Sequence, residues 1–513
     1  MAYLLNVVYL ALIVLALPWL LYQRLRNGKY REGFSAKCLG RLPKRRGNAP
    51  CLWLHAVSVG EVNLLAPLLE RWDRLHPDWD CIISTTTKAG YDLARKRYSP
   101  RTVVYCPLDF TWAVRRAMRA IRPTLFVLTE LELWPNLIAA AKRHGAKVAV
   151  INGRLGEKSF RGYRRVGWLV RRLLAQLDLI AVQNQEYAER FLALGARPET
   201  VQITGSIKFD GARSSRNSEQ TRRLAQLAGI TDNDIVFLAG STQDPEESLA
   251  LSVFETLAKD FSRLRLILVP RHPERFDEVA ALLDRRGLAW QRRSRLHESR
   301  LLTPSGRDVK TDVDHLGSAA TSPPPVPHGV GGLPKAARIL LVDAVGELAY
   351  WWGTAKIAFV GGSLTSRGGQ NMIEPAGYGA ALSFGPNTWN FRDVVSLFLD
   401  HEAAVVVRDQ NELEAFVRRC LTNLAFADEI GRRAQELVLQ QQGAADRTIE
   451  LLEQLILDAG SSARIDPSHP TSIEQKVANE AKKEKRLPAP LRFLSFLLFK
   501  CRATRESARR RLL

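Results

Sequence analysis

The stretch that decides the fold runs from Ile357 to Asn387 and reads IAFVGGSLTSRGGQNMIEPAGYGAALSFGPN. Its first four residues form an apolar run that predicts a β-strand, which Gly361 and Gly362 end. A loop rich in glycine and serine follows, and Asn371 marks the predicted start of a helix. Such a strand, glycine turn and helix N-terminus hold phosphate in many α/β proteins, because free N–H groups and the helix dipole point at the anion. Glu374 in the first turn is placed to bind a ribose diol, whereas the alternative is an ordinary turn whose glycines serve only close packing.

Short apolar runs recur on both sides of this stretch and alternate with helical patterns. The alternation predicts an α/β fold with parallel, doubly wound sheets. The runs fall into two sets, separated by a polar segment at 212–218 that we interpret as a hinge. Two Rossmann-like halves would bind a ligand at the carboxyl ends of their strands. The expected strands are 52–57, 81–85, 103–106, 125–129, 147–151, 179–182 and 201–204 in the first set, and 235–239, 266–269, 338–342, 357–360, 381–384 and 404–407 in the second.

The N-terminal residues predict a membrane anchor over 1–23. Tyr3–Tyr22 carries no charge, and about 20 apolar residues span a bilayer core. Basic residues follow at once, which by the positive-inside rule leaves the downstream chain in the cytoplasm. A cleaved signal peptide is the alternative, but it would carry its positive charge before the apolar run. We therefore expect an uncleaved single-span anchor.

The rest of the chain divides into two predicted domains, over 24–211 and 212–460, and a basic tail over 461–513. A segment rich in proline and glycine at 294–334 is expected to be a disordered surface insertion. The tail carries an apolar run at 491–499 between basic groups. That pattern fits either an interfacial helix that touches a membrane or a docked terminal helix with a frayed end.

The net charge and the placement of the cysteines restrict the classes of partner and of site that the protein can have. The 513 residues carry a formal net charge of +21, which favours an anionic partner such as lipid or a phosphorylated substrate. The basic residues are spread along the chain without an aromatic RNA-binding motif, which argues against nucleic acid. The six cysteines are scattered, which fits a reducing compartment and argues against a zinc site.

Five motifs appear in order along the chain: HAVSVGE at 55–61, ELELWPN at 130–136, GSIKFD at 205–210, VPRHPER at 269–275, and VGGSL at 360–364 followed by GQN at 369–371 and by Glu374. Together they resemble the 3-deoxy-D-manno-octulosonic acid (Kdo) transferases of lipopolysaccharide biosynthesis, over the chain from the anchor to about residue 455. The resemblance implies a GT-B fold of two facing Rossmann-like domains, of which the first binds the acceptor and the second the CMP-sugar. It implies inverting transfer of Kdo from CMP-Kdo to lipid A precursor (lipid IVA), with no metal and no cofactor. The implied location is the bacterial inner membrane, with a single pass and cytoplasmic catalytic domains.

Two other functions stay open on the residues. One is another GT-B glycosyltransferase that uses a different nucleotide sugar and a lipid acceptor. The other is a basic, membrane-anchored scaffold or nucleic-acid binder without catalytic activity. The donor pocket would discriminate a Kdo transferase from another GT-B glycosyltransferase, because CMP presents one phosphate and UDP presents two.

Glu61 is the predicted catalytic base, because inverting transfer needs a group that takes the proton of the acceptor hydroxyl. It follows a predicted strand, although a glutamate at a helix start also fits a purely structural role. Arg271 at a strand end offers a fork of N–H donors for phosphate. The resemblance implies donor (CMP) contacts at Lys208, Pro270, Arg271, Val345, Gly346, Glu347, Asn371, Met372, Ile373 and Glu374.

Neighbouring polar residues have structural interpretations. We expect His55 to be a packed histidine, and Glu130 and Glu132 to be structural or to orient the acceptor. Lys208 is either a charge near the donor anion or a solvated loop lysine. The chain departs from the family pattern at Ala36, Gln243, Gln370 and Met372, where the family usually has Glu, His, His and Pro.

Overall fold

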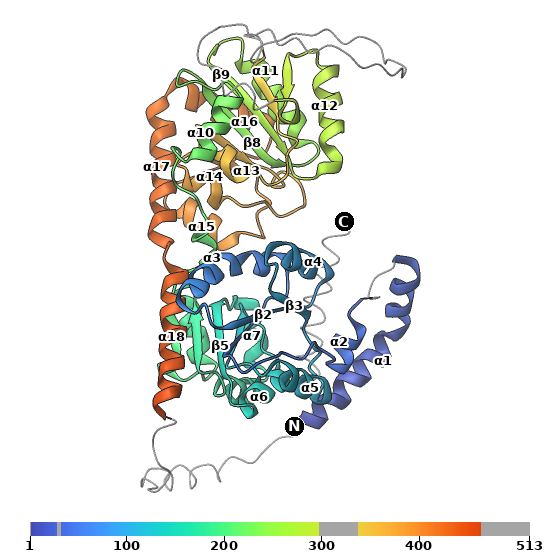
Figure 1. Cartoon of the computed structure of the whole chain (residues 1–513). Helices are drawn as coiled ribbons and strands as arrows, with labels where there is room; N and C mark the ends of the chain where they lie inside the picture. The colour runs from blue at the N-terminus through green and yellow to red at the C-terminus, as the bar shows by residue number, and fades with distance from the viewer. Residues whose placement is uncertain (1, 28–31, 297–336, 463–513) are drawn as a thin grey trace, which may run out of the picture. The chain divides into compact units, whose positions relative to one another are not determined.

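The computed structural model describes residues 2–27, 32–296 and 337–462, which form two compact units (Figure 1). Of the described residues, unit 1 holds those up to Gly211 and those from Gln441 to Ser462, and unit 2 holds those between Ala212 and Gln440. This differs from the predicted division, which kept residues up to 460 in the second domain. The predicted insertion lies outside the described residues from 297 onward, and so does the predicted basic tail from 463 onward.

Unit 1 is built on a parallel sheet with the strand order β3-β2-β1-β4-β5-β6-β7. Each strand coincides with an expected apolar run, since buried strands of parallel sheets are apolar on both faces. Tryptophan and phenylalanine pair across its centre, where Trp53 lies opposite Phe126 in the register of β1 and β4. The strands are β1 (Cys51–His55), β2 (Asp80–Thr85), β3 (Thr102–Tyr105), β4 (Leu125–Thr129), β5 (Lys147–Gly153), β6 (Leu179–Val182) and β7 (Val201–Ile203).

Helices cover both faces of this sheet. One buried cluster joins the sheet to α5, α6 and the helices that follow, and a second joins it to α3, α4 and α18. The helices of unit 1 are α1 (Ala2–Asn27), α2 (Phe34–Leu39), α3 (Val59–Leu75), α4 (Lys88–Arg97), α5 (Thr111–Ile121), α6 (Pro135–Arg143), α7 (Glu157–Arg164), α8 (Gly167–Leu174), α9 (Gln185–Ala193) and α18 (Ala444–Ser462).

Unit 2 repeats the architecture with the strand order β10-β11-β9-β8-β12-β13-β14, again parallel. The strands are β8 (Ile235–Thr242), β9 (Leu264–Pro270), β10 (Trp290–Arg292), β11 (Ile339–Leu341), β12 (Ile357–Val360), β13 (Ala381–Phe384) and β14 (Val405–Val406). The helices are α10 (Glu219–Leu227), α11 (Glu246–Leu257), α12 (Phe276–Arg285), α13 (Leu348–Trp351), α14 (Ile373–Gly377), α15 (Arg392–Asp400), α16 (Gln410–Thr422) and α17 (Leu424–Gln441). The edge strand β10 was not expected, because Trp-Gln-Arg is too short and too polar to read as a strand.

Helix α18 belongs to unit 1 because its apolar side buries Ile449 and Leu452 in the cluster that contains α3. Its start is capped by Asp210, whose carboxylate accepts the backbone N–H groups of Gly443 and Ala445 at 2.6 Å each. A carboxylate at a helix N-terminus satisfies orphan N–H groups and complements the helix dipole. An amphipathic pattern alone does not reveal which unit a terminal helix covers.

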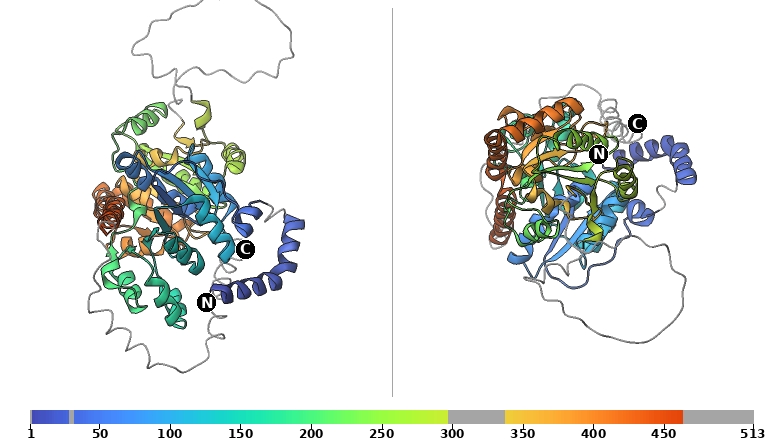
Figure 2. Two further views of the ribbon diagram at one scale, coloured as in Figure 1. Left: turned by 60° about the horizontal axis from the view of Figure 1, so that its bottom comes forward. Right: turned by 90° about the horizontal axis from the view of Figure 1, so that it is seen from above.

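The predicted anchor forms most of α1. In the parts of the chain that the structure describes, no helix is long and apolar enough to cross a membrane, so the predicted transmembrane span is not supported. Instead α1 is tied to the start of α5: Asn6 is buried and its side-chain amide donates to Thr111 Oγ1 at 2.7 Å, while the Tyr9 hydroxyl donates to Asp109 Oδ2 at 3.0 Å. Figure 2 shows that α1 is bent, and Pro18 within it is a usual cause of such a bend.

Candidate active site

Each sheet has a central switch point, where the chain crosses from one half of the sheet to the other: between β1 and β4 in unit 1 and between β8 and β12 in unit 2. Ligands of open α/β sheets bind outside the carboxyl ends of the strands at such a switch point. Glu61 follows β1, and the glycine turn at 361–362 follows β12. The sequence-predicted base and the sequence-predicted donor loop therefore each lie at the switch point of a unit.

Glu61 is held by three donors at the start of α3. The backbone N–H of Val57 donates to Oε2 at 2.8 Å, the Thr129 hydroxyl donates to Oε2 at 2.7 Å, and the Ser58 hydroxyl donates to Oε1 at 3.0 Å. Ser58 in turn accepts the Glu61 N–H at 3.4 Å as the cap of α3. This reciprocal arrangement is a variant of the capping box, so Glu61 has a structural role whatever its chemical one.

The electrostatic surroundings of Glu61 suit proton transfer. Its side chain is 8% exposed, and burial, reinforced by the nearby Glu130 and Glu132, raises its pKa to about 7. The hydrogen bonds from Thr129 and Val57 work in the opposite direction and favour the ionised form. A carboxyl whose pKa lies near the working pH can accept a proton at useful rates and release it afterwards.

Glu130 and Lys208 lie at the same edge of unit 1. Glu130 follows β4 with a left-handed backbone, φ 55°, and its N–H donates to the Ile151 carbonyl at 2.9 Å. Its carboxylate oxygen Oε1 lies 4.0 Å from Nζ of Lys208. Lys208, which was predicted among the donor contacts, belongs to unit 1 and lies beside Glu130, whereas the other predicted donor residues belong to unit 2.

His55 is the packed histidine that the sequence predicts. It is fully buried at the end of β1, and its Nδ1 lies 3.0 Å from Ser84 Oγ on the neighbouring strand. This contact orients the ring within the sheet, next to the segment that carries Glu61.

In unit 2 the N–H groups of the glycine turn are already occupied. Glu246, fully buried at the start of α11, accepts the N–H groups of Gly362 at 2.6 Å and of Ser363 and Leu364 at 2.9 Å each. The expected phosphate cradle at this turn is therefore filled by the protein's own carboxylate. The alternative reading of the glycines also finds support, because a Cβ on Gly361 would lie 2.5 Å from the Thr242 Cα. Sequence reasoning missed Glu246, although two adjacent acidic residues opening an apolar helix were a usable signal.

Two of the departures from the family pattern meet at this turn. A Cβ on Gly362 would lie 3.2 Å from Nε2 of Gln370 and 3.3 Å from Nε2 of Gln243. The two amide side chains therefore flank one point at the carboxyl edge of β8 and β12. Sequence spacing alone could not show that these departures are neighbours.

Asn371 and Glu374 form a hydrogen-bonded pair on which the charge of Arg271 acts. The Asn371 amide donates to Glu374 Oε1 at 2.9 Å, and its carbonyl oxygen accepts the Ile373 N–H at 3.1 Å. Burial raises the pKa of Glu374, while the bond from Asn371 and the charges of Arg271 and Arg213 oppose that rise. Arg271 follows β9 and is exposed, with its N–H donating to the Thr242 carbonyl at 3.0 Å. Within the described residues its guanidinium forms no ion pair, which leaves it available to an anion.

The remaining residues that were predicted to contact the donor differ from one another in burial and in their contacts. The side chains of Met372 and Ile373 are buried in the core. Pro270 is buried at the end of β9. Val345 is 78% exposed. Gly346 has a φ of 94°, a backbone conformation that favours glycine. Glu347 forms a bidentate ion pair with Arg293, whose Nε and Nη2 donate to the two carboxylate oxygens at 2.9 and 2.7 Å.

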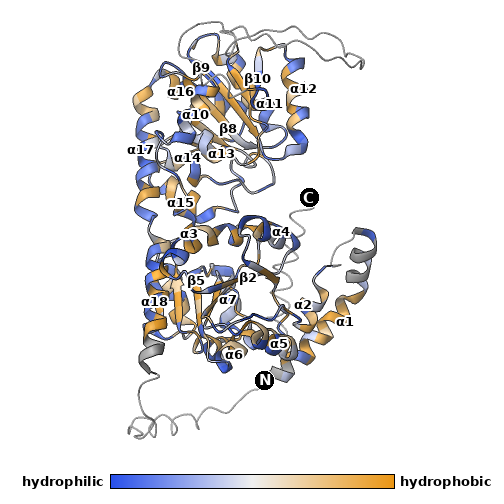
Figure 3. Ribbon diagram, in the orientation of Figure 1, coloured by the Kyte–Doolittle hydropathy of each residue, from blue (hydrophilic) through white to orange (hydrophobic). Residues whose placement is uncertain are grey.

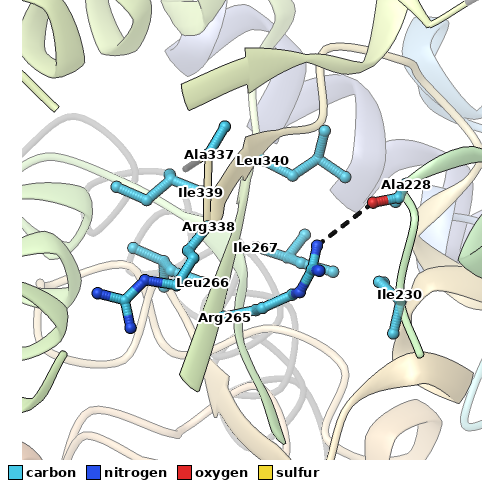
Figure 4. A pocket seen from close by; sticks show the side chains of 9 residues that line it. All are labelled: Ala228, Ile230, Arg265, Leu266, Ile267, Ala337, Arg338, Ile339 and Leu340. Carbon is cyan, nitrogen blue, oxygen red and sulfur yellow. Dashed lines mark hydrogen bonds between the residues drawn. The ribbon is translucent and has the colours of Figure 1, made fainter. Parts of the chain in front are cut away.

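A cavity lies elsewhere in unit 2. Figure 4 shows its lining, with the Arg265 guanidinium directed at the Ala228 carbonyl, 3.5 Å from Nη1. The cavity is lined by the amino-terminal part of β9 and by β11, whereas Arg271 follows the carboxyl end of β9. None of the predicted site residues lines it, so it is separate from the candidate site.

Across residues 2–27, 32–296 and 337–462, no group of three or more His, Cys, Asp and Glu side chains is arranged to hold a metal ion.

Comparison with known proteins gives a consistent set of relatives. Residues 31–211 match the model of a family described as 3-deoxy-D-manno-octulosonic-acid transferase (kdotransferase). The 3-deoxy-D-manno-octulosonic acid transferase of Bordetella pertussis is 31% identical over 450 residues, which cover 85% of this chain and 95% of that protein. The enzyme of the same name from Haemophilus influenzae is 28% identical over 415 residues, covering 79% and 88%. The crystal structure of the C-terminal CMP-Kdo binding domain of WaaA from Acinetobacter baumannii is 26% identical and covers 43% of this chain and 96% of that domain, with a TM-score of 0.34.

Proposed function

Because this chain belongs to the 3-deoxy-D-manno-octulosonic acid (Kdo) transferase family, we propose that it transfers Kdo from CMP-Kdo to a lipid A precursor. The observation that carries the proposal is the buried Glu61 carboxyl, with a pKa of about 7, at the switch point of unit 1. We assign acceptor activation to unit 1 and donor binding to unit 2, in a GT-B enzyme that inverts the anomeric centre.

The proposed reaction is a direct displacement at C2 of Kdo. The acceptor hydroxyl oxygen forms a bond to C2 while the bond from C2 to the phosphate oxygen of CMP breaks. The bonding electron pair leaves with that phosphate oxygen, and the hydroxyl proton passes to the Glu61 carboxylate. A sugar hydroxyl is a weak nucleophile, so removal of its proton during attack lowers the barrier.

In unit 2 we assign the departing phosphate to Arg271. Its guanidinium is exposed at the carboxyl end of β9 and can offer two parallel N–H donors to phosphate. Asn371 and Glu374 form a hydrogen-bonded pair, and we assign the second carboxylate oxygen of Glu374, Oε2, to the hydroxyls of the nucleotide ribose. Glu246 acts indirectly, since it fixes the turn that precedes this pair.

The direct test uses the purified full chain with CMP-Kdo and a tetra-acylated lipid A precursor, with the lipid product read by mass spectrometry. The proposal predicts lipid carrying added Kdo and release of CMP. A parallel reaction with a UDP-sugar donor tests the alternative GT-B activity, since UDP presents a second phosphate. Transfer from the UDP-sugar with none from CMP-Kdo would overturn the proposed donor.

A lipid acceptor requires contact with a membrane, and we propose that α1 makes that contact at the bacterial inner membrane, with the catalytic units on the cytoplasmic side. Figure 3 shows α1 as largely hydrophobic. Val14 and Leu15 on this helix are 65% and 78% exposed, although α1 is docked at Asn6 and Tyr9. Exposed apolar groups followed by basic ones favour the interfacial region of an anionic membrane.

The membrane contact is tested by flotation with anionic lipid vesicles. The variant Val14→Asp with Leu15→Asp is expected to float less than the wild type in high salt. Leu399→Asp in unit 2 changes a partly exposed leucine outside α1 and serves as the control. Equal flotation of the wild type and the α1 variant would contradict this role of α1.

A further inference from the structure

The polar segment 212–218, which the sequence predicted to be a hinge, is built into unit 2. Arg216 donates from its guanidinium to three backbone carbonyls, those of Tyr378 at 2.8 Å, Gly353 at 3.1 Å and Ala355 at 2.8 Å. The backbone of the segment also lies very close to α14, because a Cβ on Gly377 would lie 2.6 Å from the Arg213 carbonyl oxygen. The segment is therefore fixed against the helix that carries Glu374.

The fixed backbone presents the side chain of Arg213 at the candidate donor site. Its guanidinium carbon lies 4.2 Å from the centre of the Tyr350 ring, a cation–π geometry that orients the planar group. Arg213 is exposed, and within the described residues its guanidinium forms no ion pair and donates no hydrogen bond to a protein acceptor. Its charge acts on Glu374, as does that of Arg271.

The guanidinium groups of Arg213 and Arg271 thus both act by their charge on one carboxylate, which is already hydrogen-bonded to Asn371. Two positive charges against one negative charge leave a net attraction for a further anion. Neither guanidinium is engaged by another carboxylate in the described part of the chain, in contrast to Arg275 nearby, which pairs with Glu247 at 2.6 Å.

The proposed donor carries two anions at its reacting centre. Kdo is an ulosonic acid, so its carboxylate is attached to C2, the carbon that also bears the phosphate of CMP. A guanidinium binds either group through two parallel N–H donors. Two anions on one carbon match two guanidinium groups whose charges act on the same carboxylate.

We propose that Arg213 is a second anion-binding residue of the donor site, which acts with Arg271 on the phosphate or the carboxylate at C2 of the bound sugar. The inference rests on the proposed function and adds to it a residue from the segment that joins the two units. Tyr350 acts as a positioning residue, because it orients the Arg213 guanidinium without touching the donor.

The experiment compares Arg213→Ala, Arg213→Met and Tyr350→Leu with the control Arg222→Ala, which removes an exposed arginine from α10. Binding of CMP is measured by calorimetry, and the KM for CMP-Kdo is measured in the transfer assay. Thermal melting identifies the variants that keep the wild-type fold, and Arg213→Met, which retains an unbranched side chain, guards against unfolding of the alanine variant.

Loss of a charge-assisted contact weakens binding about tenfold to a hundredfold. We expect that loss for both Arg213 variants, a smaller loss for Tyr350→Leu and none for Arg222→Ala. Weaker CMP binding assigns Arg213 to the phosphate, whereas an increased KM for CMP-Kdo with unchanged CMP binding assigns it to the carboxylate. Unchanged CMP affinity and unchanged KM in a folded Arg213 variant would overturn the inference.

The design separates this inference from the proposed function. If the wild type binds CMP and Arg271→Ala weakens that binding while the Arg213 variants leave both quantities unchanged, only the role of Arg213 is rejected. If the wild type binds no CMP and transfers no Kdo, the proposed function itself is rejected.

Discussion

Thr129, the last residue of β4, donates a hydrogen bond of 2.7 Å from its hydroxyl to Oε2 of Glu61, in the first turn of α3. This contact joins the end of β4 to the helix that follows β1, and these two strands flank the switch point of unit 1. It favours the ionised carboxylate, whereas burial and the charges of Glu130 and Glu132 favour the protonated form. The balance of these opposing effects sets the pKa of Glu61.

A pair of substitutions separates the effect that lowers the pKa of Glu61 from the effect that raises it. Thr129→Val removes a hydrogen bond to the carboxylate and is expected to raise the pKa of Glu61. Glu130→Gln removes a negative charge and is expected to lower it. A hydrogen bond to a charged group contributes about 1.5–3 kcal/mol, so Thr129→Val is expected to shift the pKa by about one to two units. The pH dependence of kcat/KM reports both shifts, and movement of both profiles in the same direction would contradict the assignment.

Stability should depend on the same ionisation. The folded-state pKa of Glu61 is raised to about 7 from its ordinary value of 4.5, so the folded state binds more protons between these values. The stabilisation that Glu61 contributes to the folded state is fully present below about pH 4.5 and is lost as the pH rises through about 7. This shift of about 2.5 pKa units corresponds to about 3.4 kcal/mol.

Urea denaturation of the wild type and of Glu61→Gln checks this linkage. The difference in unfolding free energy between them should shift by about 2–3 kcal/mol between pH 5 and pH 8, in favour of the glutamine variant at pH 8. A difference that stays constant over this range would show that Glu61 titrates normally.

Glu246→Gln tests the carboxylate that holds the glycine turn. The amide cannot accept all the N–H groups of Gly362, Ser363 and Leu364 that now reach the carboxylate. Each buried donor left without an acceptor costs about 1–3 kcal/mol, so the turn should open more often. Hydrogen–deuterium exchange of peptides covering 361–364 should accelerate, with the exposed Glu219→Gln of α10 as the control. Unchanged exchange would mean that close packing of the glycines alone fixes the turn.

Arg271 and Arg275 form a matched pair four residues apart. Arg271→Ala should weaken CMP binding about tenfold to a hundredfold with little change in melting temperature, because its guanidinium has no ion-pair partner in the described structure. Arg275→Ala should lower the melting temperature instead, because it leaves the buried Glu247 carboxylate unpaired. The same effect from both variants would remove the distinction between a donor residue and a structural one.

Much of the fold could be predicted because buried parallel strands leave short apolar runs in the sequence. The positions of Glu61 and Arg271 after the carboxyl ends of β1 and β9 were also predicted, at the sheet edge where ligands bind, whereas the roles of Glu61, Arg271, Asn371 and Glu374 stay predictions. No single apolar segment of the sequence reveals the order of the strands in the sheet, so the residues that are neighbours across a switch point could not be predicted. For that reason the contact of Glu246 with the turn after β12, and that of Thr129 with Glu61, had to come from the structure. Arg213 was missed because a polar segment between two domains looks the same whether it is a hinge or is packed against one of them.

The central claim, that Glu61 accepts the proton of the acceptor hydroxyl, is tested most directly by single-turnover Kdo transfer across pH 5.5–9 with the wild type and Glu61→Gln. The wild-type rate should rise with pH through about 7, where the carboxyl ionises. The variant keeps the shape but loses the charge, and its rate should fall about a hundredfold or more, with no rise near pH 7 and unchanged CMP binding. A variant with a near-normal rate and the wild-type pH profile would show that another group takes the proton. Glu32, whose pKa is lowered by its hydrogen bond from Lys88, would then be tested next.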